Sequence, residues 1–345
     1  MFAGQQDYVV GVDTHRDRHA LAVIAAATGA LVLETEIGAD RCGYELALAF
    51  AGEHARGSRL WAIEGSGSYG AGLARFLAEQ GEQVVEVERP QRQERRQGKS
   101  DRIDALRAAR AVLRETALPR AAGAREALRA LLTTREGAVA TRRAGLNQLR
   151  ALIVIAPESL RGELRRLTRA RLLAHCARLR AERQLDPQLR GTMLALRACA
   201  RRVQAATIEE RELKREILRL VEELAPQLLA EPGVGPISAA QLIVSWSHQG
   251  RFAGESAFAR HAGAAPIPAS SGQTLRHRLD RGGDRALNRA LHTIIVSRRK
   301  HHPATIAYVQ RRTSEGKSIR EAIRCLKRYL ARHLFRLLEA APITA

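Results

Sequence analysis

The sequence predicts an α/β domain followed by two mostly helical segments, an α/β plus α organisation. Short apolar runs separated by turn residues fill the first 87 residues, which is typical of strands alternating with helices. From Leu128 to Leu224, apolar residues recur every three or four positions, which indicates long helices. Beyond residue 230, glycine and proline turns separate further helical patterns. We therefore expect three modules, residues 1–119, 120–230 and 231–345.

The first module begins with three short apolar runs that suggest an antiparallel meander: Tyr8–Val12, Ala20–Ala25 and Leu31–Ile37. Helical and strand patterns then alternate in the order βββαβαβα, with the later elements at Tyr44–Ala51, Leu60–Ile63, Gly70–Glu79, Gln83–Val87 and Asp101–Leu113. This order predicts a mixed sheet with helices packed on its faces.

The middle module carries two long helical patterns, one before and one after Pro157. Apolar positions amid arginine and glutamate predict a helical hairpin or a coiled coil. An ordinary helical bundle without a partner is an equal alternative, because Arg135 and Arg142 interrupt a strict heptad.

The third module opens with a Pro-Gly-Val-Gly-Pro turn and an apolar helix over Ile237–Trp246. This string resembles the turn of helix-hairpin-helix DNA-binding proteins, in which glycine N–H groups and a helix N-terminus face a phosphate. Gly233 and Gly235 are therefore candidate nucleic-acid-binding residues, although the same string also serves as a plain helix–helix turn. A loop over Gly263–Gly272 and helices from about Asp284, Pro303 and Ser318 complete the chain.

The charge of the chain points to a phosphate polymer as its partner. The 345 residues include 57 Lys and Arg against 36 Asp and Glu, a formal net charge of +21. A GC-rich genome explains why lysine is scarce, but it leaves the net excess unexplained. A positive field spread along the chain favours nucleic acid and makes its binding salt-dependent.

Cysteine spacing and hydropathy predict a cytoplasmic protein with no membrane partner. The four cysteines form no CxxC pair, so neither a zinc knuckle nor a disulfide framework is expected. The first residues lack the charged and apolar regions of a signal peptide. The most apolar early stretch, Ala20 to Leu33, is too short to span a bilayer.

Four acidic residues stand where a metal-dependent nuclease would need them. Asp13 and Glu64 each end a predicted strand, and Asp101 and Asp104 lie three apart on one face of a predicted helix. Hard divalent cations such as Mg²⁺ prefer oxygen ligands and can clamp the attacking and leaving oxygens of a phosphodiester. The alternative is that the strand-end acids are turn or cap residues and the helix pair is a solvated face.

The order of these motifs resembles a known family. The strings Gly-Val-Asp-Thr, Ile-Glu-Gly-x-Gly-x-Tyr and Lys-x-Asp-x-x-Asp-Ala are similar to those of the DEDD insertion-sequence transposases, the insertion sequence 110 family, related to the Piv invertase. The likeness continues through Pro-Gly-Val-Gly-Pro, Phe-Ala-Arg-His-Ala-Gly-Ala-Ala-Pro and Gly-Asp-Arg-Ala-Leu-Asn-Arg-Ala-Leu, and so covers nearly the whole chain. It implies a RuvC-type ribonuclease H fold for the first module, a helical middle module that joins subunits and a C-terminal transposase domain.

The resemblance also implies a nucleophilic serine directly before a glycine, shortly after the Ala-Gly-x-x-Pro string. This points to Ser271, with Ser270 as the competing register. A serine hydroxyl can form a phosphoserine linkage, and nearby cations such as Arg276 or Arg278 would stabilise the charge that develops. A serine in a loop rich in Pro, Gly and Ser otherwise serves turn geometry. His277 lies close in sequence and could act as an acid or base, but a phosphate-facing or surface position is favoured for it.

The family further implies particular partners. These are donor and target DNA, a bridge RNA that guides both, and a homodimer that pairs into a tetramer. In that arrangement the acidic residues of one subunit meet the serine of another.

Two other functions remain open at the level of sequence. A Holliday-junction resolvase would use the metal site alone and hydrolyse DNA without a covalent intermediate. A non-catalytic nucleic-acid-binding protein would need only the basic helices and the Pro-Gly-Val-Gly turn. A tyrosine recombinase is disfavoured, because His277-Arg278 belongs to no Arg…His-x-x-Arg…Tyr series.

Overall fold

The chain divides into two compact units. One comprises residues 1–127 and 224–345, and the other, which we call the hairpin unit, comprises residues 128–223. The computed structural model describes residues 6–87, 101–114, 119, 123–268, 277–278, 280 and 282–340. The module boundaries expected at residues 119 and 230 stay a prediction.

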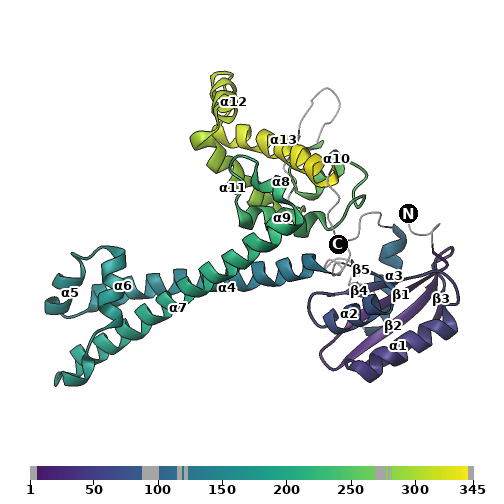
Figure 1. Cartoon of the computed structure of the whole chain (residues 1–345), viewed down its shortest axis with the longest axis horizontal. Coiled ribbons are helices and arrows are strands. Elements are labelled where there is room, and N and C mark those ends of the chain that lie inside the picture. Colours follow the sequence, from purple (N-terminus) through teal and green to yellow (C-terminus); the bar gives the residue numbers. More distant parts are fainter. Residues whose placement is uncertain are drawn as a thin grey trace. The chain divides into compact units, whose positions relative to one another are not determined.

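A five-stranded mixed sheet in the order β3-β2-β1-β4-β5 forms the N-terminal part (Figure 1). Its strands are β1 (Tyr8–Thr14), β2 (Arg18–Ala25), β3 (Leu31–Gly38), β4 (Arg59–Glu64) and β5 (Gln83–Val87). The first three strands form the predicted antiparallel meander, and β4 pairs parallel with both β1 and β5. Its helices are α1 (Arg41–His54), α2 (Ala71–Glu79) and α3 (Asp101–Arg114). The predicted mixed α/β sheet with this element order is confirmed.

Alternating residues of β1 belong to two hydrophobic clusters, because successive side chains of a strand point to opposite faces. Val10 and Val12 pack in one cluster with residues of α1 and α2. Val9 packs in the other with Ala109 and Val112 of α3. Residues of odd number on β1 therefore face α3.

Gly11 lets α3 lie directly on β1. A Cβ built at Gly11 would stand 2.1 Å from the Ala105 carbonyl oxygen and 2.7 Å from the Ala109 Cβ. Neither the helix backbone nor an alanine methyl group can yield by that much. At the start of the same helix, Arg102 pairs with Glu34 of β3 at 3.2 Å. These contacts fix the first turn of α3 over the sheet.

Two long helices form the hairpin unit (Figure 1). They are α4 (Ala124–Ile155), whose first turn precedes the unit, and α7 (Pro187–Leu224). Between them lie α5 (Glu158–Leu164), α6 (Arg169–Ala177) and the short η3 (Ala181–Arg183). The Cys199 Sγ approaches the Gly145 carbonyl oxygen at 3.0 Å, and a Cβ at Gly145 would meet Val203 at 2.6 Å. The helical character predicted for this segment is confirmed, whereas the coiled coil stays a prediction.

A buried carboxylate joins the two long helices farther along. Arg135 of α4 donates to one oxygen of Glu210 at 2.6 Å, and Arg142 donates to the other at 2.9 Å. Both arginines are the residues that interrupt the heptad pattern of α4. They serve as the partners of an acid on α7 and not as packing residues.

The C-terminal part of the first unit is mostly helical, as predicted. Its helices are α8 (Pro226–Leu229), α9 (Pro236–Trp246), α10 (Glu255–His261), α11 (Arg285–His301), α12 (Pro303–Ser314) and α13 (Ile319–Ala340), and its two short paired strands are β6 (Ile267–Pro268) and β7 (His277–Arg278). Asp284 caps α11 by accepting from the N–H groups of Ala286 and Leu287. Across the described part of the chain, helices are too short or too polar to cross a membrane.

Candidate active site

Two parallel strands bring Asp13 and Glu64 to the same edge of the sheet. Val12 of β1 is in register with Ile63 of β4, and each acid follows one residue later on its own strand. Both residues are only 7% exposed. Side chains two or four residues apart on a strand point to the same face of the sheet. Asp13 therefore shares a face with Gly11, and Glu64 shares a face with Leu60 and Ala62, which pack with α3. The sequence therefore places both acids on the face that α3 covers.

The first turn of α3 carries the other two predicted acids. Asp101 is the first residue of the helix and is exposed, whereas the Asp104 side chain is only 18% exposed. One turn later, Ala105 is pressed against Gly11. Because Gly11 precedes Asp13 by two residues on β1, this contact sets the start of α3 beside Asp13.

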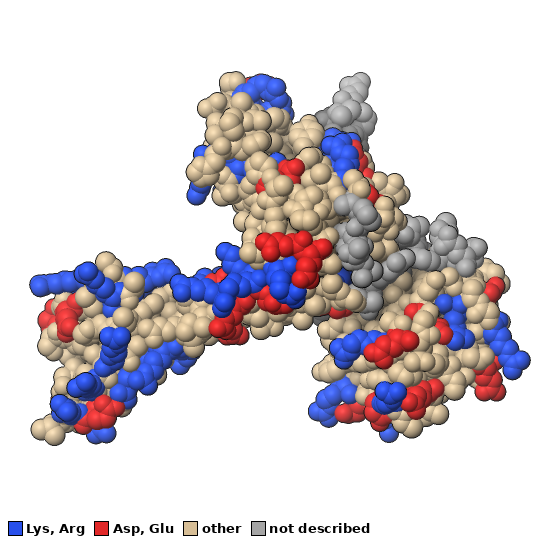
Figure 2. Space-filling model, viewed as in Figure 1, with Lys and Arg blue, Asp and Glu red and all other residues tan. Residues whose placement is uncertain are grey.

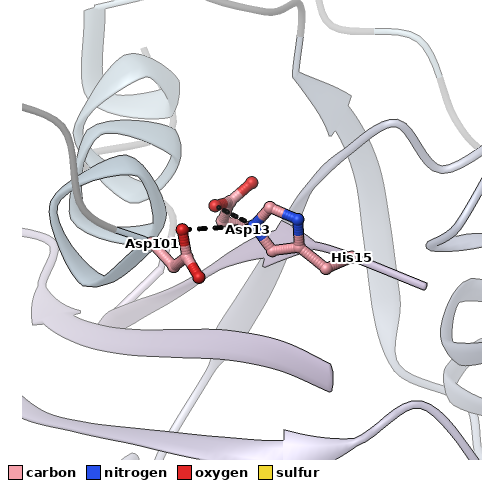
Figure 3. Close-up of side chains that lie close together, drawn as sticks. All are labelled: Asp13, His15 and Asp101. Carbon is pink, nitrogen blue, oxygen red and sulfur yellow. Dashed lines mark hydrogen bonds and ion pairs between the residues drawn. The ribbon is translucent and has the colours of Figure 1, made fainter. Parts of the chain in front are cut away.

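His15 lies between two of these acids (Figure 3). Its Nε2 is 3.2 Å from Asp13 Oδ2 and 3.3 Å from Asp101 Oδ1. A ring nitrogen carries at most one hydrogen, so it can donate fully to only one of the two carboxylates at a time. The negative charge gathered around this nitrogen is thus only partly compensated by the protein.

Sequence reasoning overlooked His15. A histidine just past a strand end is usually a surface residue, and the string Gly-Val-Asp-Thr ends one residue before His15. The available signal was the spacing: residues 13 and 15 are two apart, so they share a face if the strand continues. The structure assigns β1 as far as Thr14.

The pKa of Asp13 is raised above its usual value. Burial is the main cause, and the negative charges of Asp104 and Asp101 add to it, while His15 acts in the opposite direction. A buried carboxylate beside other carboxylates gains most from a nearby cation. Among the residues that the structure describes, Asp13, His15 and Asp101 form a group that could hold one cation, because their ligand atoms lie within 4.8 Å of one another. Two oxygens and one imidazole nitrogen fit a divalent ion of the Mg²⁺ or Mn²⁺ type.

The four predicted acids are therefore grouped only in part. Asp13 and Asp101 share a cluster with His15, while Glu64 and Asp104 flank it on a strand and a helical turn. Asp104 forms an ion pair with Arg107 at 2.8 Å. The Glu64 backbone carbonyl accepts from the Thr14 hydroxyl at 2.7 Å, which ties the ends of β1 and β4 together. A shared cation site for all four acids stays a prediction.

The residues proposed around the serine fall mostly outside the described part of the chain. Ser270, Ser271 and Arg276 lie in the undescribed segment 269–276. His277 and Arg278 make up strand β7, which pairs antiparallel with Ile267 and Pro268 of β6.

Gly233 and Gly235 have different structural settings. Gly233 has a φ of +76°, and a Cβ there would stand 3.0 Å from the Ile294 carbonyl oxygen of α11. The turn needs glycine at this position for its own geometry. Gly235 is the N-cap of α9, and a Cβ there would meet nothing within 4 Å. Gly235 is thus the better candidate for a contact with a phosphate at the start of α9.

Comparison with known proteins places this geometry in a family. A family model of DEDD transposases of the IS110 type matches residues 10–157, and a model described as transposase IS116/IS110/IS902 family matches residues 225–310. The uncharacterized 43.6 kDa protein of insertion element IS110 from Streptomyces coelicolor is 33% identical over 133 residues. That match covers 38% of this chain and 33% of the relative, so it spans about a third of the relative's length. The first model contains all four predicted acids, and the second contains Ser271. The chain belongs to the IS110 family of transposases.

Proposed function

We propose that this chain is a DNA transposase that cuts and rejoins DNA strands with the help of a bound divalent cation. The observation that carries the proposal is the meeting of Asp13, His15 and Asp101 on the α3 face of the sheet, next to buried Glu64. Such a group on a basic chain suits the hydrolysis or transfer of phosphodiesters, whose charge must be neutralised on approach.

In this proposal Asp13, His15 and Asp101 hold the cation, and Glu64 and Asp104 complete its surroundings. The bound ion supplies charge stabilisation to a phosphodiester under attack. The chain's own contribution is placement. Gly11 seats α3 against β1, and the Thr14 hydroxyl joins the ends of β1 and β4. The acids are thereby set in position before DNA arrives.

Ser271 is the proposed nucleophile, and the family resemblance supports it. Its Oγ forms a bond to phosphorus while the bond from phosphorus to a deoxyribose oxygen breaks. The serine hydroxyl gives up a proton, and the departing deoxyribose oxygen gains one. Because one phosphate ester replaces another, a second DNA end can reverse the exchange and reseal the strand without ATP. Arg276 and Arg278 stabilise the charge that develops.

The same resemblance supports the remaining parts of the proposal. The first 119 residues form a RuvC-like domain, and a bridge RNA selects the donor and target DNA. A homodimer pairs into a tetramer, in which one subunit's acidic cluster acts with the Ser271 segment of another.

A trapping experiment tests the covalent step. The full chain is incubated with Mg²⁺, RNA transcribed from the non-coding flank of the element, and DNA that matches it. We expect a protein–DNA adduct that survives denaturation and disappears in Ser271→Ala, while DNA binding persists. It also disappears in Asp13→Asn, because an unactivated serine hydroxyl is a weak nucleophile. Asp17→Asn is the matched control, since Asp17 is an exposed acid in the turn that follows β1 and pairs with Arg16.

The variants also separate the rival functions. Loss of the adduct in Ser270→Ala but not in Ser271→Ala moves the nucleophile by one residue. Cleavage that survives both serine substitutions and is lost in Asp13→Asn identifies a hydrolytic resolvase and contradicts the serine mechanism. DNA binding without any cleavage by the unaltered chain, under all these conditions, leaves a non-catalytic nucleic-acid-binding protein.

A further inference from the structure

One end of the hairpin unit, residues 142–202, is far more basic than the rest of that unit. We call it the basic end. It contains fifteen arginines, no lysine and four acidic residues, whereas residues 203–223 contain four basic and six acidic residues. Figure 2 shows blue side chains gathered over the end of the unit that contains α5, α6 and the first part of α7. The charge of α7 thus changes sign along its length.

Most arginines of the basic end are exposed and lack an acidic partner. Its acids are already engaged, since Glu158 pairs with Arg161, Glu163 with His175 and Glu182 with Arg197. Asp186 accepts from backbone N–H groups at the start of α7. Among the described residues, twelve exposed arginines of the basic end form no ion pair: Arg143, Arg150, Arg165, Arg166, Arg169, Arg171, Arg178, Arg180, Arg183, Arg190, Arg201 and Arg202. Arg201 and Arg202 donate instead to the Ala177 carbonyl and to the Gln148 side chain.

Unpaired guanidinium groups at this density repel one another, so folding alone does not account for them. Each presents planar, forked N–H donors that match the oxygens of a phosphate. Arg143 and Arg150 lie seven residues apart on one face of α4, which is about 10 Å along the helix. One strand of a double helix presents about three phosphates over that length.

The hairpin unit contains no Phe, Trp or Tyr, which favours a double-stranded over a single-stranded nucleic acid as its ligand. Proteins that bind single strands stack the bases on aromatic side chains. The same lack argues against a lipid surface, where Trp and Tyr usually lie at the interface. Duplex backbone, which needs only charge and hydrogen-bond donors, remains the matching ligand.

We propose that the basic end of the hairpin unit binds the sugar–phosphate backbone of double-helical nucleic acid, independently of base sequence. It would be a second contact surface, remote in sequence from the acidic cluster and from the Ser271 segment. It needs no divalent cation. Duplex DNA and a base-paired stretch of RNA share the chemistry that the arginines recognise, and the experiment distinguishes them.

The test compares two triple variants of the full chain that remove the same charge from the same unit. The first is Arg165→Gln, Arg166→Gln and Arg171→Gln in the basic end. The matched control is Arg211→Gln, Lys214→Gln and Arg215→Gln, all exposed residues on α7 outside it. Affinity for a 20-base-pair DNA duplex, an RNA duplex of equal length, the single strands and anionic lipid vesicles is measured in EDTA from 0.05 to 0.3 M salt. Thermal melts check that both variants fold.

The basic-end variant should bind a duplex on the order of 10²-fold more weakly at 0.15 M salt, with a salt dependence shallower by roughly two to three contacts. The control should lose much less. A loss for DNA alone, or for RNA alone, supports the proposal and names the duplex. Equal losses in both variants, losses only for single strands or only for vesicles, or no loss at all would overturn it. Asp13→Asn should retain duplex binding, so a failure of the proposed catalytic function leaves this result unaffected.

Discussion

Gly11 of β1 and Ala105 of α3 lie so close that a Cβ on the glycine would stand 2.1 Å from the alanine carbonyl oxygen. The neighbouring residues on both elements are acids of the candidate site. Asp13 follows Gly11 by two residues, and Asp104 immediately precedes Ala105. The absence of a Cβ at Gly11 therefore allows α3 to pack closely against β1, the strand that carries Asp13.

Gly11→Ala should move α3 away from β1 and weaken both folding and cation binding. We expect a loss of at least about 1–3 kcal/mol of unfolding free energy, the usual cost of overpacking. Gly52→Ala is the control, because Gly52 lies inside α1 with nothing within 4 Å of an added Cβ. The control should gain about 0.5–1 kcal/mol, since alanine favours helix over glycine. Thermal melts and Mn²⁺ binding check both; unchanged binding in Gly11→Ala would contradict the positioning role.

His15 should make the site favour Mn²⁺ over Mg²⁺, because imidazole suits transition metals better than it suits magnesium. His15→Ala is expected to lower Mn²⁺ affinity by about 10-fold or more, with a smaller effect on Mg²⁺. Electron paramagnetic resonance of free Mn²⁺, with Mg²⁺ as competitor, measures both. If His15 only links Asp13 to Asp101, its removal would lower the affinity for both metals equally.

The buried carboxylate of Asp13 should lower the free energy of unfolding at neutral pH when no cation is present. Burial raises the pKa of Asp13, so the folded protein holds its proton to higher pH than the unfolded chain does. Stability should fall as pH rises from the ordinary range of an aspartate through this raised pKa. Asp13→Asn lacks that loss, so in EDTA its advantage in melting temperature should grow over this window and vanish at lower pH. An Asp13→Asn difference that is constant across pH would contradict this account.

Glu210→Gln should destabilise the hairpin unit. Burial raises the pKa of Glu210, but Arg135 and Arg142 outweigh it and hold the pKa below its usual value. Its contribution is therefore present above the usual pKa of a glutamate and lost as pH falls through the lowered one. We expect a cost of roughly 2–4 kcal/mol at pH 7 that shrinks in acid. Glu209→Gln, its exposed neighbour, should be nearly neutral in melts followed by circular dichroism.

The sequence was sufficient for the elements that carry the acids, because alternation and helical spacing are local. Asp13 and Glu64 were found at strand ends, and the Asp101 helix began where its pattern did. Their meeting with His15 depends on a helix seated by Gly11, which no local pattern reveals. The partners of Glu210 lie on α4, 75 and 68 residues away in the sequence. Which arginines meet Glu210 therefore depends on how α4 and α7 are aligned along each other. The short helices α5 and α6 were not predicted, because their apolar patterns span only about two turns.

The absence of aromatic residues from the hairpin unit has an optical consequence. The two tryptophans, Trp61 on β4 and Trp246 on α9, are both buried and both outside it. Their fluorescence therefore reports the sheet and the C-terminal helices and is nearly blind to the hairpin. Circular dichroism at 222 nm, in contrast, weighs its long helices heavily. A chain whose hairpin unit melts first would lose ellipticity while its emission spectrum stays unchanged, so the two signals together separate the units without cutting the chain.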